Sequence, residues 1–132
     1  ALKKIKSYLD YGAFTPVQVA SAAALDSTED HIEKMRNTYT RRRETLIASL
    51  ANAGWDVEPP SSTMFAWAKI PTKFDNMGSF EFAKMLLTEA HVAVAPGAGF
   101  GQYGEGYVRI GLVENTELIR QAAKQIKRAV DL

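Results

Sequence analysis

Arg109 is the residue of this sequence whose position best suits ligand chemistry. It lies within residues 107–113, where positions 108, 110 and 112 are apolar and alternate with the others. This period of two predicts a strand that carries Arg109 beside Gly111, on the face opposite the apolar residues. A guanidinium held on a rigid strand can bind a carboxylate through two hydrogen bonds, and Gly111 leaves room beside it. The same pattern also fits an arginine on a solvated sheet face.

Residues 99–104 read GFGQYG and match the GxGxxG pattern of dinucleotide-binding loops. That mechanism requires the glycines to open a helix whose N-terminus holds a pyrophosphate. Here the predicted strand at 107–113 follows instead, and no suitably placed acidic residue stands about 20 residues further on to bind a ribose. We therefore interpret Gly99, Gly101 and Gly104 as a glycine-rich loop between two strands, with a nucleotide-binding oxidoreductase as the weaker alternative.

The other reactive residue types give no complete site. Arginines 41–43 would point about 100° apart on a helix, so we expect a solvated, salt-bridged surface with Glu44 and not a phosphate-binding face. His31 and His91 are sixty residues apart in a chain without cysteine, which gives a metal site little support. None of the nine lysines lies in an apolar surround typical of a Schiff-base nucleophile. We expect no metal site in this chain.

Helices are predicted to support these residues. A short basic helix covers residues 1–9 and ends before Gly12, and Thr15 and Pro16 begin a second helix that runs to about residue 25. A long helix follows, capped by Ser27 and ended by Gly54. Ser79 is expected to cap a helix through residue 90, and Asn115 the last one. The predicted apolar stripes are Ile32, Met35, Tyr39, Leu46, Leu50 and Ala53 on the long helix, and Leu118, Ala122, Ile126 and Val130 on the last.

Four segments carry strand patterns, at residues 55–58, 64–70, 91–95 and 107–113. The order helices, strands, helix, strands, helix predicts an α+β fold. We expect a two-layer sandwich in which a small, mainly antiparallel sheet is covered by helices. Residues 1–25 would form a helical segment ahead of an α+β core at 27–132.

Composition narrows the function classes. A chain of 132 residues with 46% hydrophobic and 23% charged residues is typical of one globular domain. A net charge of +1 gives no field that would recruit nucleic acid or an anionic membrane. The longest uncharged stretch, at 11–25, is shorter than the ~20 residues of a membrane span. The absence of cysteine fits a reducing compartment, so we expect a cytoplasmic protein.

Four segments in order along the chain resemble class I/II, fold-type I aminotransferases. They are residues 8–18 (YLDYGAFTPVQ), 62–71 (STMFAWAKIP), 92–101 (VAVAPGAGFG) and 107–115 (YVRIGLVEN). The subgroup that they resemble acts on alanine, glutamate or diaminopimelate-type substrates. The resemblance covers essentially the whole chain, and it implies the C-terminal small domain of such an enzyme.

The resemblance implies that Arg109 binds the α-carboxylate of an amino acid substrate. It also implies that Phe14 and Thr15 approach the active site of the partner subunit in a homodimer, with residues 1–25 facing the other domain or the dimer. The large domain that holds pyridoxal 5'-phosphate would precede this region. The parent enzyme would move an amino group between an amino acid and a 2-oxo acid. This chain alone would be inactive, hold no cofactor and contain no catalytic residue.

One further alternative remains open. The same α+β sandwich could serve as a stand-alone module that binds a small carboxylate, or that mediates oligomerisation, without catalysis.

Overall fold

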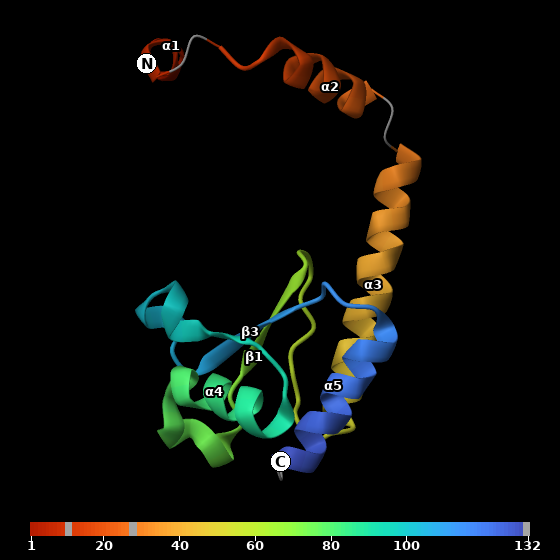
Figure 1. Ribbon diagram of the computed structural model, residues 1–132, viewed down its shortest axis with the longest axis vertical. Helices are drawn as coiled ribbons and strands as arrows, with labels where there is room; N and C mark the ends of the chain where they lie inside the picture. The colour runs from red at the N-terminus through yellow and green to blue at the C-terminus, as the bar shows by residue number, and fades with distance from the viewer. Residues whose placement is uncertain (10–11, 27–28, 131–132) are drawn as a thin grey trace. The chain divides into compact units, whose positions relative to one another are not determined.

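The computed structural model describes residues 1–9, 12–26 and 29–130 (Figure 1). They divide into two compact units, Ala1–Arg36 and Asn37–Leu132. The N-terminal unit holds helices α1 (Leu2–Leu9) and α2 (Thr15–Asp26) and the beginning of α3 (Glu29–Ala51). Neither α1 nor α2 buries a side chain within the described chain. The expected cap Ser27 lies outside the described residues.

The C-terminal unit is built on a three-stranded antiparallel sheet. Its strands are β1 (Phe65–Lys69), β2 (Ala95–Pro96) and β3 (Tyr107–Gly111), and β3 lies between the other two. The end of α3 and helices α4 (Gly78–Ala90) and α5 (Thr116–Ala129) share one hydrophobic core with this sheet (Figure 1). Three short 3-10 helices complete the unit: η1 (Thr72–Met77), η2 (Gly97–Phe100) and η3 (Gln102–Gly104). The predicted α+β architecture is confirmed.

One face of the sheet carries small buried side chains. Ala66, Ala68 and Val108 are fully buried, and the short alanines allow the helices to approach the strands closely. Next to them, the rings of Trp55 and Phe82 meet edge to face with their centroids 5.6 Å apart. Burial of a large apolar side chain contributes roughly 1.5–3 kcal/mol, so this layer supplies much of the stability of the unit.

The predicted apolar stripe of α5 is confirmed at Ile126 and Val130, but not at Leu118, and Ala122 is only partly buried. Ile119, Ala123 and Ile126 are buried with Val130, whereas Leu118 is 43% exposed. The predicted stripe began at Leu118 and stepped four residues at a time, which drifts around a helix of 3.6 residues per turn. The observed spacing of four, three and four residues keeps the side chains on one face.

The long helix α3 follows its prediction in its second half. Leu46, Leu50 and Ala53 are buried, and Tyr39 packs partly buried against the same core. Ile32 and Met35 belong to the N-terminal unit, within which they are exposed.

Two predicted strands are not strands in the structure. At residues 55–58 the alternation is real, since Trp55 and Val57 are buried and their neighbours are exposed, but the backbone pairs with no strand of the described chain. At residues 91–95 only Ala95 pairs, in the two-residue strand β2. His91 instead ends α4 in the left-handed conformation, with φ of 54°, and the Val92 N–H donates to the Leu86 carbonyl.

Of the two predicted helix caps Asn115 and Ser79, one is confirmed and the other is wrong. The Asn115 side chain accepts hydrogen bonds from the backbone N–H groups of Glu117 and Leu118, so this cap is confirmed. Ser79 is not a cap, because α4 already begins at Gly78 and the Ser79 hydroxyl is engaged elsewhere. In the part of the chain that is described, no helix combines the length and apolar character that a membrane crossing requires.

Candidate functional site

Arg109 lies in the middle of the central strand, on the face of the sheet opposite the alanine layer. Its cross-strand neighbours are Trp67 on β1 and Ala95 on β2. Along β3, Val108 is fully buried on the other face. The strand pairing therefore fixes the backbone of Arg109 from both sides, which suits a side chain that must hold one position.

Two aromatic rings cover the guanidinium of Arg109. Its Cζ atom lies 4.1 Å from the ring centroid of Phe65 and 4.3 Å from that of Phe100. Trp67 makes edge contacts with Phe100 and with Tyr107, at centroid distances of 5.4 and 6.5 Å. We call Phe65, Trp67, Phe100 and Tyr107 the aromatic cluster. Each cation–π contact is worth about 0.5–1 kcal/mol at an exposed site, and together the two contacts favour this position of the guanidinium.

A Cβ atom placed on Gly111 would have the Val113 side chain within 4 Å, at 3.6 and 3.7 Å. Phe65 is the direct cross-strand partner of Gly111, and its ring centroid lies 4.1 Å from Arg109 Cζ. The hydrogen-bonding edges of the guanidinium remain: within the described chain Arg109 has neither an ion pair nor a hydrogen bond to an acceptor side chain. The arrangement can therefore present N–H donors to an external carboxylate.

The glycine-rich segment serves a packing role in this structure. A Cβ atom on Gly97 would lie 1.9 Å from the Gly104 carbonyl oxygen, and one on Gly104 would lie 2.1 Å from the Gly97 oxygen. These two backbones can cross only without side chains. The segment runs through η2 and η3 into strand β3, as expected for a loop between strands, so no helix N-terminus follows the GxGxxG pattern.

Glu105 stands at the end of this segment, next to the beginning of α4. The backbone N–H of Ser79, that of Gly106 and the Ser79 hydroxyl donate to its carboxylate and lower the pKa of Glu105 below the ordinary value of 4.5. A carboxylate at this end of a helix also meets the positive end of the helix dipole. Glu105 is thus held ionised while remaining exposed.

The three consecutive arginines separate, as the helical spacing requires. Arg42 Nη1 donates to the Leu112 carbonyl at 3.0 Å, and Arg43 Nη1 donates to the Pro60 carbonyl at 3.3 Å. Both are partly buried, so the expected fully solvated surface is wrong for these two. Their hydrogen bonds fasten α3 to the segment that precedes β1 and to the residue that follows β3.

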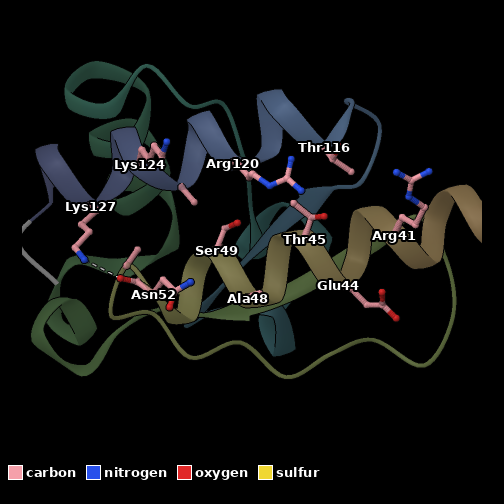
Figure 2. Close-up of a pocket in the computed structure, with 12 residues that line it drawn as sticks. Arg41, Glu44, Thr45, Ala48, Ser49, Asn52, Thr116, Arg120, Lys124 and Lys127 are labelled. Atoms are coloured by element: carbon pink, nitrogen blue, oxygen red, sulfur yellow. Dashed lines mark hydrogen bonds between the residues drawn. The ribbon is translucent and has the colours of Figure 1, made fainter.

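Arg41 lines a basic groove between α3 and α5 (Figure 2). This groove has a volume of about 710 Å³. Lys127 Nζ crosses it to donate to the Asn52 carbonyl at 2.8 Å. The groove residues include Arg120, Lys124 and Lys127 on α5, and Glu44 is its acidic member. Since no lining residue belongs to the aromatic cluster, the groove is separate from the Arg109 site.

The remaining candidates belong to other elements of the two units. Phe14 and Thr15 lie at the start of α2 in the N-terminal unit, and Phe14 is 74% exposed. His31 is on α3, in the same unit, and His91 ends α4. Within residues 1–9, 12–26 and 29–130, no cluster of three or more potential ligand side chains is placed to hold a metal ion.

Sequence reasoning missed three residues of this region: Phe65, Phe100 and Glu105. The period-two pattern of β1 does place Phe65 and Trp67 on one face, and pairing with β3 would have brought them to Arg109. No local pattern identifies Phe100 or Glu105: the contact of Phe100 with Arg109 depends on how the intervening loop folds, and Glu105 acts on Ser79, 26 residues away.

Comparison with known proteins identifies the family. The profile of the family "Aminotransferase class I and II" matches residues 1–126. Over 128 residues the chain is 57% identical to AatC of Rhizobium meliloti, covering 97% of this chain and 32% of that protein. It is 53% identical over 127 residues to the glutamate-pyruvate aminotransferase AlaC of Escherichia coli, and 38% over 130 residues to an LL-diaminopimelate aminotransferase of Moorella thermoacetica. These matches cover 96% and 98% of this chain and 31% and 33% of the relatives.

Solved structures agree with the sequence comparisons. Substrate-bound BacF of Bacillus subtilis superposes with a TM-score of 0.85 at 33% identity, covering 95% of this chain and 32% of BacF. An aminotransferase of Staphylococcus aureus gives a TM-score of 0.86 at 30% identity, covering 96% and 33% of the two chains. The chain thus spans about a third of the length of the relatives that it matches. A family profile over nearly the whole chain, together with a shared fold at these identities, shows that the chain belongs to the class I and II aminotransferases.

Proposed function

We propose that this chain is the part of an aminotransferase that binds the substrate carboxylate, with Arg109 as the binding residue. The parent enzyme would move an amino group between an amino acid and a 2-oxo acid. Relatives that are named glutamate-pyruvate and LL-diaminopimelate aminotransferases support this reaction class. The observation that carries the assignment of Arg109 is its guanidinium, which lies over two aromatic rings and has no hydrogen-bond acceptor in the described chain.

The geometry gives Arg109 a positioning task. The N–H groups of a guanidinium point outward in its own plane, where two of them match the two oxygens of a carboxylate. The rings of Phe65 and Phe100, with centroids 4.1 and 4.3 Å from Cζ, support the guanidinium in its place. A carboxylate held in that way cannot rotate freely about its bond to the α-carbon. Arg109 therefore fixes the orientation of the α-carbon substituents, which both the amino acid and the 2-oxo acid require.

We propose that pyridoxal 5'-phosphate is held outside this chain. All nine lysines are exposed, and none lies in the enclosed apolar surround that a Schiff-base lysine needs. The cofactor is expected from the family, and it supplies the electron sink of amino-group transfer when it is bound. We assign the cofactor to the large domain of the parent enzyme. The chain by itself is then expected to show no turnover.

Replacement of Arg109 in the complete enzyme tests the proposal. Since a hydrogen bond to a charged group is worth about 1.5–3 kcal/mol, Arg109→Ala should raise KM for the amino acid and for the 2-oxo acid and lower kcat/KM by about 10- to 100-fold. Arg120→Ala removes an exposed arginine of the groove and serves as the matched control. An unchanged kcat/KM in Arg109→Ala would refute the assignment. The same result would also count against the alternative of a stand-alone carboxylate-binding module, because that alternative relies on Arg109 too.

We propose further that residues 1–25 face another domain or subunit, with Phe14 and Thr15 near the active site of a partner in a homodimer. The exposed apolar side chain of Phe14 supports this role, since it buries nothing within its own unit. Mixing subunits tests it. We expect the Arg109→Ala and Phe14→Ala enzymes both to be impaired. In a heterodimer of the two, one site combines Arg109 of the Phe14→Ala subunit with Phe14 of the Arg109→Ala subunit, and this site should be active. Failure to regain activity on mixing would contradict a shared site.

A further inference from the structure

A hydrogen-bonded chain joins Glu105 to the beginning of α4. Glu105 Oε1 accepts from the backbone N–H of Ser79 at 2.7 Å, and from that of Gly106 at 3.0 Å. Glu105 Oε2 accepts from the Ser79 hydroxyl at 3.0 Å. One carboxylate thus holds both the N–H and the O–H of the same serine, which leaves that side chain a single orientation.

The chain continues from Ser79 into the glycine-rich segment. The Ser79 side chain is completely buried, and its oxygen accepts a hydrogen bond from the Ala98 N–H at 3.0 Å. Because the hydroxyl has one hydrogen, which it donates to Glu105, its lone pairs are the groups that face Ala98. The ionised carboxylate therefore sets the direction in which the hydroxyl can hold the Ala98 amide.

Both ends of residues 97–106 are fixed by this arrangement. Ala98 is bonded to Ser79 near one end, and Glu105 is bonded to Ser79 near the other. The crossing of Gly97 and Gly104 closes the segment between them. Phe100 belongs to this segment. It lies two residues beyond Ala98, and its ring contacts the guanidinium of Arg109.

Phe100 is half exposed, with 50% of its surface accessible, so its burial alone does not hold it in place. Its ring contacts are to Arg109 and to Trp67. The position of the ring therefore depends on the backbone of η2, and the described hydrogen bond that links η2 to α4 is the one from Ala98 to Ser79.

We propose that Ser79 and Glu105 are positioning residues that hold Phe100 against Arg109 and so keep the guanidinium in the position in which it binds a carboxylate. This inference rests on the proposed role of Arg109. Ser79 and Glu105 act through Phe100, since neither has a described contact with Arg109. They lie on a different element from the binding residue and are separated from each other by 26 residues.

The test uses the complete enzyme with the variants Ser79→Ala and Glu105→Gln. Hydrogen–deuterium exchange measured on peptides from residues 97–106 should become faster in both, because the amide of Ala98 loses its oriented acceptor. KM for the amino acid and for the 2-oxo acid should rise together by about two- to fivefold, the factor that one exposed cation–π contact carries, while kcat stays nearly constant. The matched control is Glu81→Gln. It also removes a carboxylate near the beginning of α4, but this one belongs to the first turn of the helix itself.

A double-mutant comparison separates positioning from general support of the fold. If Ser79 acts through Phe100, Ser79→Ala should add nothing to the KM of Phe100→Ala. Additive effects, or an equal effect of Glu81→Gln, would overturn the proposal. If Ser79→Ala does not fold because its site is buried, Glu105→Gln combined with Phe100→Ala makes the same comparison at an exposed residue. Where Arg109→Ala raises KM and these variants do not, the positioning role fails and the carboxylate site stands.

Discussion

The crossing of Gly97 and Gly104 gives the sharpest stability prediction. A Cβ on Gly97 would lie 1.9 Å from the Gly104 oxygen and 2.5 Å from the Tyr107 oxygen, although real contacts of this kind are essentially never below 3.0 Å. The backbones must therefore separate by about 1 Å, and one of them belongs to the central strand β3. No flexible side-chain end can absorb that movement. We expect Gly97→Ala to lower the free energy of unfolding by about 3 kcal/mol, the upper end of the usual range for overpacking.

Two neighbouring glycines serve as controls for that prediction. Gly99 has nothing within 4 Å of the position that a Cβ would occupy, so Gly99→Ala should change the free energy of unfolding by less than about 0.5 kcal/mol. Gly101 has the same open space but a φ of +109°, so Gly101→Ala should cost about 1–3 kcal/mol through backbone strain alone.

Urea unfolding followed by far-ultraviolet circular dichroism measures all three changes. A loss of about 3 kcal/mol should also lower the melting temperature by about 10 °C in a chain of this size. The expected order of destabilisation is Gly97, then Gly101, then Gly99. If Gly97→Ala is as stable as Gly99→Ala, the close crossing does not exist in solution and the packing argument is wrong.

Two further predictions concern the ends of helices. Folding lowers the pKa of Glu105, so the unfolded chain binds a proton at this carboxylate more readily than the folded chain does. The contribution of Glu105 to the free energy of unfolding is therefore present above pH 4.5, and it is lost as the pH falls through the lowered pKa. Glu105→Gln should flatten that part of the acid-unfolding curve, and an identical curve would contradict the hydrogen bonds to Ser79. Asn115→Ala should cost about 1 kcal/mol in urea unfolding by removing the cap of α5, and Asn115→Asp should retain most of it; equal loss in both would exclude capping as the cause.

What could be predicted from the sequence is what depends on neighbouring residues. The strand around Arg109 follows from an alternation over seven residues, and the cap at Asn115 depends on N–H groups two and three residues away. Both features need no knowledge of the rest of the fold. The face of β3 that carries Arg109 was predictable for the same reason.

The features that escaped prediction depend on distant partners. Residues 55–58 alternate between core and solvent as a strand does, but a strand also needs a backbone partner, which the local pattern does not contain. Phe100 was visible only as one residue of a glycine-rich loop, and its contact with Arg109 arises when the loop folds back over the sheet. Glu105 had no signal, because its partner Ser79 was assigned to a helix cap that α4 does not use.

The strand order has a consequence for how the protein is made. In the described sheet, β1 and β2 each pair with β3 and not with each other, and β3 is the last of the three to be synthesised. A ribosome releases β1 first, so no backbone bond of the sheet can form until residues 107–111 emerge. During that interval β1 is a strand with two unpaired edges and with Phe65 and Trp67 on its surface, which is the kind of segment that associates with other chains. The time taken to translate residues 70–111 therefore sets how long the nascent chain is vulnerable to aggregation.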